Sequence, residues 1–244
     1  MPASDQTPTA VGTLISALPL DNNDTNHDFQ ESNVTIEFPR AILAEDADFV
    51  GALVAIVNAA YLETEAGIFK PGYQRTTADG ISSLIRAGHL GVALLETPAS
   101  SSPNNPPQNG NEEQETETRA QGRTPIGCIC IRRDDADGCG ELGMLALDAT
   151  YRGRGLGRDL VVFAEKHCLG LRGLRLELLV PIGWEHPFKV RLLAWYQRMG
   201  YVPVEEEEGE KNENATRDFA ESYPELAPML EGPVELRVLE KALA

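Results

Sequence analysis

The residues best suited to chemistry in this chain lie in a glycine-rich turn, Arg152-Gly153-Arg154-Gly155-Leu156-Gly157. The turn separates a strand-like apolar run, 141–147, from a run with helical spacing, 156–171. The first backbone N–H groups of a helix have no intrahelical partner and lie at the positive end of its dipole, so they can bind an anion. Because glycine also lets the backbone approach a ligand closely, the turn predicts a phosphate or pyrophosphate site.

The spacing of the glycines limits the kinds of ligand that the turn is expected to bind. A dinucleotide-binding turn needs G-x-G-x-x-G, but its third glycine would fall at Arg158. A P-loop needs Lys followed by Ser or Thr, and no such pair follows this turn. What remains is R-x-x-G-x-G, formed by Arg152, Gly155 and Gly157. This pattern resembles the pyrophosphate-binding signature of the GCN5-related N-acetyltransferase (GNAT) superfamily, which binds acetyl coenzyme A (acetyl-CoA).

The flanking sequence strengthens the resemblance. The family's strand before the turn ends in a pattern like L-x-V-x-P, and here Leu145-Ala146-Leu147-Asp148-Ala149 stands in its place, with leucine for valine and alanine for proline. Downstream, the strand-like run 174–180 and the helix-like run 188–199 follow in the family's order. The closing Y-x-x-x-G-[FY] element is Tyr196 to Tyr201.

The resemblance implies an α/β (α+β) GNAT fold, with a mixed, mostly antiparallel, twisted sheet of about six to seven strands flanked by helices. Residues 1–33 are rich in Thr, Asn, Asp and Ser and predict a disordered tail. Residues 34–244 then form a single domain. Low-complexity insertions are predicted at about 98–123 and 205–232.

The resemblance also implies how the coenzyme binds. The backbone of Leu145, Ala146 and Leu147 would hydrogen-bond the pantetheine arm, and the amides from Arg152 to Gly157 would bind the pyrophosphate. The side chains of Arg154 and Arg158 either add contacts or are solvated. Where the family often has a pantetheine-binding asparagine, this chain has Lys189, which could reach a coenzyme phosphate instead.

Acetyl transfer to an alkyl amine needs a base, because an amine with a pKa near 10.4 is about 99.9% protonated at pH 7. Glu141 resembles the family's general-base glutamate in its placement. Its even separation from Leu145 and Leu147 predicts that all three side chains share one strand face. The alternative for Glu141 is a solvated acid at the start of a strand.

A proton donor is needed near the coenzyme sulfur. Tyr196 matches the tyrosine that commonly serves as general acid in the family, and a phenol of pKa about 10 keeps its proton at neutral pH. The alternative for Tyr196 is an aromatic residue that packs beside Leu192 and Leu193.

The predicted function is transfer of an acetyl group from acetyl-CoA to an amine, by direct attack in a ternary complex. A small-molecule primary amine is the favoured acceptor. Four loop residues either recognise its cation or have no role in binding it: Glu63, Glu65, Phe69 and Tyr73. Two alternatives stay open. One is a protein lysine or N-terminal acetyltransferase, and the other is a non-catalytic acyl-CoA-binding sensor or interaction module.

Composition and residue spacing argue against nucleic-acid-binding, metal-binding and membrane proteins. The net charge of −17 disfavours nucleic-acid binding, although acidic and basic residues nearly balance over 34–97 and 124–204. The four cysteines and four histidines lack metal-ligand spacing, so no metal is expected. No run of apolar residues long enough for a membrane helix is expected either. Free thiols favour the cytoplasm, with the nucleus left open, and a homodimer is left open too.

Overall fold

The computed structural model describes residues 14–15, 33–96, 122–134, 138–204 and 216–243. Its strands are β1 (Leu14–Ile15), β2 (Val34–Glu37), β3 (Leu90–Glu96), β4 (Arg123–Asp134), β5 (Cys139–Leu147), β6 (Gly173–Pro181), β7 (Val202–Pro203), β8 (Thr216–Asp218) and β9 (Val234–Ala242). Its α-helices are α1 (Ala47–Thr64), α2 (Ala78–Arg86), α4 (Leu156–His167), α5 (Pro187–Arg198) and α6 (Phe219–Ser222), and its 3-10 helices are η2 (Ala41–Glu45), η3 (Ala149–Tyr151) and η4 (Ala227–Met229).

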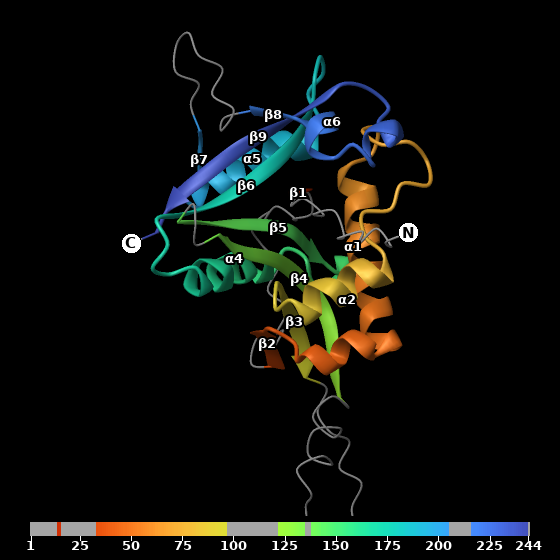
Figure 1. The fold of residues 1–244 in the computed structure, drawn as a ribbon, viewed down its shortest axis with the longest axis vertical. Helices are drawn as coiled ribbons and strands as arrows, with labels where there is room; N and C mark the ends of the chain where they lie inside the picture. Colours follow the sequence, from red (N-terminus) through yellow and green to blue (C-terminus); the bar gives the residue numbers. More distant parts are fainter. Residues whose placement is uncertain (1–13, 16–32, 97–121, 135–137, 205–215, 244) are drawn as a thin grey trace, which may run out of the picture.

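The strands form one sheet in the order β2-β3-β4-β5-β6-β9-β7, with β1 beside β6 and β8 beside β9 (Figure 1). Every neighbouring pair is antiparallel except β5–β6 and β1–β6. The predicted mixed, mostly antiparallel sheet is confirmed. Its main path has the seven strands expected at the upper end, and the short strands β1 and β8 add to it.

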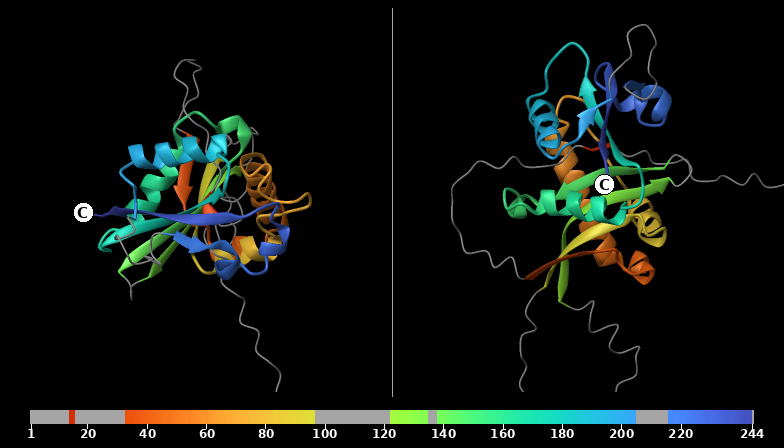
Figure 2. Two further views of the ribbon diagram at one scale, coloured as in Figure 1. Left: turned by 90° about the horizontal axis from the view of Figure 1, so that it is seen from above. Right: turned by 90° about the vertical axis from the view of Figure 1, so that its left-hand side faces the viewer.

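Helices cover both faces of the sheet (Figures 1 and 2). On one face, α1 and α2 pack on β3, β4 and β5 around a core that includes Cys128 and Cys130. These two cysteines share a strand face and behave as small apolar side chains. On the other face, α4 and α5 bury most of the leucines and isoleucines of β4, β5 and β6.

Helix α1 illustrates how local sequence sets the fold. The Asp46 side chain caps it by accepting hydrogen bonds from the N–H groups of Asp48 and Phe49, both at 3.0 Å. By length and composition alone this helix could also cross a membrane, with a mean hydropathy of 1.3 over 18 residues. The expectation that no such run exists is therefore wrong for α1. Its buried face, however, packs on β4 and β5 as a core helix does.

Two predicted low-complexity segments differ from expectation where the structure describes them. The segment 205–232 is folded over its second part, where residues 216–232 contain β8, α6 and η4. Arg123, assigned to the end of the first insertion, belongs to β4 and donates hydrogen bonds to Glu37. Residues 98–121 of that insertion, and most of the predicted tail, lie outside the described residues.

Candidate active site

The candidate site is a fork between the parallel strands β5 and β6. Their pairing runs only from Cys139 with Gly173 to Leu142 with Leu176. Beyond that point β5 continues to Leu147 and β6 to Pro181, but the two no longer pair with each other. Backbone N–H and C=O groups on their facing edges are therefore available to a third chain or a ligand.

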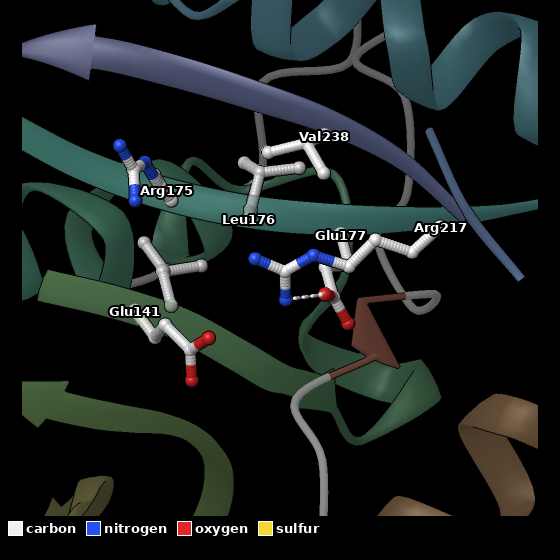
Figure 3. A pocket seen from close by; sticks show the side chains of 7 residues that line it. Glu141, Arg175, Leu176, Glu177, Arg217 and Val238 are labelled. Carbon is white, nitrogen blue, oxygen red and sulfur yellow. Dashed lines mark hydrogen bonds and ion pairs between the residues drawn. The ribbon is translucent and has the colours of Figure 1, made fainter. Parts of the chain in front are cut away.

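β1 lies in this fork. It pairs in parallel with β6, with Leu14 opposite Glu177 and Ile15 opposite Leu178, and it also lies against β5. Figure 3 shows it as the short red-brown arrow beside β6. The open edge of β6 thus accepts an extended backbone, here supplied by the chain's own N-terminal region.

A β-bulge in β5 decides which side chains face the site. Cys128 pairs with Ala146 but Cys130 pairs with Gly143, so β5 has one extra residue, and Met144 has a φ of 45°. Leu145 and Leu147 consequently face α4, whereas Met144 and Ala146 face α1.

The bulge also corrects a prediction about Glu141. Its neighbour Leu142 is buried on the α4 face, so Glu141 lies on the opposite face, toward α1 and α2. The expectation that Glu141 shares a face with Leu145 and Leu147 is therefore wrong, because the extra residue breaks the period of two between them.

The glycine-rich turn follows β5 after the short 3-10 helix η3. Gly153 and Gly155 have φ angles of 73° and 85°, and an ideal Cβ at either position would meet nothing within 4 Å. Gly155 is the N-cap of α4 and supplies no side-chain cap. The first N–H groups of α4, at Leu156 and Gly157, therefore lack an intrahelical acceptor. The geometry is that of an anion site.

The arginines of the turn have different surroundings. Arg152 donates from Nη1 to Glu63 at the end of α1 (2.5 Å) and from Nε to the carbonyl of Leu147 (3.3 Å). These bonds tie the turn to the end of β5 and to α1. Arg154 lies over the ring of Tyr151, 5.7 Å from its centroid, and Arg158 is exposed on the first turn of α4.

Tyr196 lies on α5 and is completely buried. Its ring packs edge-on against Trp195 and Tyr201, and its hydroxyl has no hydrogen-bond partner among the described residues. Burial raises the pKa of this phenol well above its usual range. An unpaired buried hydroxyl is costly, and a catalytic role is one of the reasons for which proteins retain such a group.

Lys189 lies on the same face of α5, two helical turns before Tyr196. It is buried, and its Nζ donates to Oε1 of buried Glu65 at 3.1 Å. Burial lowers the pKa of Lys189, and the Glu65 carboxylate opposes that shift. The predicted contact with a coenzyme phosphate is not what the structure shows, because this ammonium is paired with Glu65 in the interior.

His186 joins the start of α5 to the end of α1. Its Nδ1 accepts from the N–H of Phe188, which caps α5, and its Nε2 lies 3.2 Å from the carbonyl oxygen of Ala66. Burial lowers the pKa of His186, which favours the neutral ring that both bonds require. Together with the Lys189–Glu65 pair, this contact fixes the helix that carries Tyr196.

The loop between α1 and α2 forms a wall with the segment 216–232. The backbone N–H of Lys70 donates to Met229 (2.7 Å), and that of Glu231 donates to Ile68 (2.9 Å). Lys70 also donates from Nζ to the carbonyl of Pro228. Two segments far apart in sequence therefore close the same side of the site.

Aromatic rings fill this wall. Phe69 stacks on Tyr73, with centroids 3.8 Å apart, and contacts Phe219 edge-on. Of the four residues expected to recognise a cation, Phe69 and Tyr73 thus pack together, while Glu63 and Glu65 form ion pairs with Arg152 and Lys189.

Two carboxylates lie near the start of the fork. Glu141 projects from β5 and Glu177 from β6 (Figure 3). Glu177 accepts from the hydroxyl of Tyr223 (2.8 Å) and from Nη1 of Arg217 (2.7 Å). Burial raises the pKa of Glu177, the two hydrogen bonds oppose this shift, and the charge of Glu141 adds to it.

Several polar residues of the site are absent from the sequence prediction. Buried Arg75 lies over the ring of Tyr61, 5.1 Å from its centroid. Burial alone would lower the pKa of Arg75, but its tyrosine neighbours and Glu65 raise it. The sequence did contain a signal for Glu177 as a site residue, because it is a charged residue within an apolar strand. Arg217 and Tyr223 had none, because only the tertiary fold brings them to β6.

Part of the chain is similar in sequence to a known protein family, and its fold is similar to that of several solved structures. Residues 116–203 match the sequence model of the acetyltransferase (GNAT) domain. No curated protein sequence matches the chain. Among the described residues, no cluster of three or more metal-ligating side chains occurs.

Solved structures of similar fold include three N-acetyltransferases. PaiA from Thermoplasma acidophilum, in complex with coenzyme A, is 16% identical over 86% of this chain and 98% of its own (TM-score 0.49). An enzyme from Staphylococcus aureus is 15% identical over 87% and 99% (TM-score 0.49). N-acetylglutamate synthase from Neisseria gonorrhoeae is 16% identical over 88% of this chain, which spans only 36% of the synthase (TM-score 0.47). Likenesses this distant say nothing about the acceptor.

The match to the GNAT domain covers the elements that build the site. It includes β5 with its fork, the glycine-rich turn, α4, and the helix that carries Tyr196. Over residues 116–203 the chain therefore contains an acetyltransferase (GNAT) domain, as the resemblance of the glycine-rich turn implied.

Proposed function

We propose that the protein transfers an acetyl group from acetyl-CoA to a primary amine, by direct attack while both substrates are bound. The observation that carries this proposal is that the unpaired edge of β5 and the glycine-rich turn are close together in the chain. This edge, from Gly143 to Leu147, is joined to the turn at Gly153–Gly157 by only a short linker that contains η3. Five residues of extended strand span about 16 Å, so this edge suits an extended arm that ends in a pyrophosphate.

The chain's own residues would hold the coenzyme in two ways. Backbone groups of Leu145, Ala146 and Leu147 would bond the pantetheine amides along the edge of β5. The first N–H groups of α4 and the turn would bond the pyrophosphate, and the space above Gly153 and Gly155 admits it. Hydrogen bonds to charged groups contribute about 1.5–3 kcal/mol each, so a few of them anchor the coenzyme.

Proton movement completes the reaction. Glu141, on the face toward α1 and α2, would take the proton that the acceptor's ammonium must lose before its nitrogen attacks the thioester carbonyl. The carbon–sulfur bond then breaks, and the Tyr196 hydroxyl would give its proton to the departing thiolate. The second proton that the acceptor nitrogen loses as the amide forms would restore the phenol. That hydroxyl is buried, protonated and without a partner among the described residues, which suits this role.

The test measures thiol release from acetyl-CoA with a panel of amines, amino acids and basic peptides, alongside calorimetric binding of coenzyme A. Glu141→Gln and Tyr196→Phe should each reduce turnover by about 10²–10⁴-fold while coenzyme affinity is kept. Tight coenzyme binding with no turnover on any acceptor would refute catalysis and favour a sensor.

A further inference from the structure

A recess of about 380 Å³ opens beside Glu141. Its polar lining consists of His89, Arg132, Arg133, Glu141, Arg175 and Arg217. Four guanidinium groups therefore surround a single carboxylate, in a chain whose net charge is −17. A recess of this size suits a small ligand, and its charge suits one that carries an anionic group.

Strand register places the arginines on both sides of Glu141. Arg132 on β4 lies directly opposite Glu141, and Arg175 on β6 lies directly opposite it on the other side. Directly opposed side chains have Cβ atoms about 4.5–5.5 Å apart, so all three converge on one patch of the sheet. Burial and the charge of Arg132 lower the pKa of His89, so this imidazole adds a neutral polar group at pH 7.

Ion pairs hold two of these guanidiniums in place. Arg175 donates from Nε to Glu240 at 2.8 Å, and Arg217 donates from Nη1 to Glu177 at 2.7 Å. A guanidinium has five N–H donors, so an ion pair with one carboxylate does not exhaust it. Fixed, planar donors of this kind recognise carboxylates through paired hydrogen bonds.

The recess narrows toward the fork. Glu141, Arg175 and Arg217 also line a small cavity of about 10 Å³ that adjoins Glu177 (Figure 3). Glu177 thus lies at the narrow end beside Glu141, whereas Arg132 and Arg133 line only the wider part. An ammonium between Glu141 and Glu177 would relieve the mutual repulsion that contributes to the raised pKa of Glu177.

The geometry points to an amino acid as the acceptor, with its amine at Glu141 and Glu177 and its carboxylate at Arg132, Arg175 and Arg217. This inference rests on the proposed acetyl transfer and names the substrate class of the same site. It replaces recognition of a simple cation by Glu63 and Glu65, because Glu141, unlike those two residues, lines the recess together with the arginines.

Matched pairs of acceptors test it with the full-length protein. Each pair differs only by a carboxylate, as in L-lysine and cadaverine, L-tyrosine and tyramine, or L-tryptophan and tryptamine. For at least one pair, kcat/KM for the amino acid should exceed that for its decarboxylated partner by about 10-fold or more, as expected for one lost charge-assisted hydrogen bond. Preference for the decarboxylated partner in every pair would overturn the inference.

Substitutions of arginine test which residue recognises the carboxylate of the acceptor. Arg132→Gln should raise KM for the preferred amino acid by about 10-fold more than it raises KM for the decarboxylated partner. Arg237→Gln is the matched control, because Arg237 is likewise a strand arginine near a glutamate, Glu235, but lies on β9 outside the recess. Equal losses on both members of a pair in Arg132→Gln would contradict carboxylate recognition.

A binding measurement separates this inference from the proposed reaction. The same amino acids are titrated by calorimetry into the protein saturated with coenzyme A. Binding that Arg132→Gln weakens, without any turnover, would support the anion site and refute acetyl transfer. Turnover confined to amines without a carboxylate, with no amino acid bound, would refute the anion site and keep the reaction.

Discussion

Gly155→Ala is the change whose effects follow most directly from the structure. Gly155 has a φ of 85°, in the left-handed region where a residue with a Cβ is strained by roughly 1–2 kcal/mol. An ideal Cβ there meets nothing within 4 Å, so alanine adds strain without a clash. In a domain of this size, a loss of 1–2 kcal/mol lowers Tm by about 2–8 °C.

The same strain acts on the predicted anion site. Alanine relieves it by rotating the backbone at the N-cap of α4, which turns the N–H groups of the turn away from a bound pyrophosphate. Each charge-assisted hydrogen bond lost costs about 1.5–3 kcal/mol. Since about 1.4 kcal/mol corresponds to a factor of ten, Kd for coenzyme A measured by calorimetry should rise about 10- to 150-fold.

Gly170→Ala separates the two effects. Gly170 has a φ of 90°, also has nothing within 4 Å of an ideal Cβ, and follows the opposite end of α4. It should lower Tm to a similar extent and leave the coenzyme Kd unchanged. If Gly155→Ala lowered Tm while its Kd stayed at the wild-type value, the assignment of the turn as the pyrophosphate site would be refuted.

Four further outcomes are expected. Tyr196→Phe removes a buried hydroxyl with no partner among the described residues, so Tm in a thermal melt should stay equal or rise while kcat falls; a lower Tm with unchanged kcat would contradict this. Deleting residues 1–32 removes β1 from the fork, where it pairs with β6 and also lies against the β5 edge proposed for the coenzyme, so calorimetry should show tighter coenzyme binding, by roughly 5-fold for each net hydrogen bond of about 1 kcal/mol lost with β1, and unchanged affinity would mean that β1 does not compete. Lys189→Met leaves the buried Glu65 carboxylate without its ion-pair partner and should lower the free energy of unfolding, measured in urea, by about 3–5 kcal/mol. Adding Glu65→Gln should recover most of this stability; no recovery would show that the pair is not coupled. Because burial lowers the pKa of His186 from 6.5, its stabilising contribution is present above pH 6.5 and is lost as pH falls, so His186→Asn should flatten the decline of Tm between pH 7 and 5; an unchanged slope would assign that decline to other groups.

The sequence predicted the glycine-rich turn and the strands and helix around it, because their conformation depends on nearby residues. The glycine pattern at 152–157 predicted a turn that opens a helix, because left-handed φ angles and a helix N-terminus have strong sequence signals. Alternating and helical apolar spacing located β5, β6 and α5 to within two residues at each end.

The rest depended on tertiary structure. One extra residue at Met144 changes which side chains of β5 face the site, and no period in the sequence reveals it. The segment 216–232 has a polar composition, yet pairing of β8 with β9 orders it and brings Arg217 and Tyr223 to Glu177. Lys189 looked available to a phosphate because its partner Glu65 lies 124 residues away.

The backbone bonds between the α1–α2 loop and the segment 216–232 have a consequence for dynamics. The amides of Lys70 and Glu231 donate across the same junction, so neither can exchange with solvent deuterium until the two segments separate. If the wall opens as a unit to admit the acceptor, both amides should exchange at one shared rate. A bound acceptor that holds the wall closed should then slow that rate at both positions together.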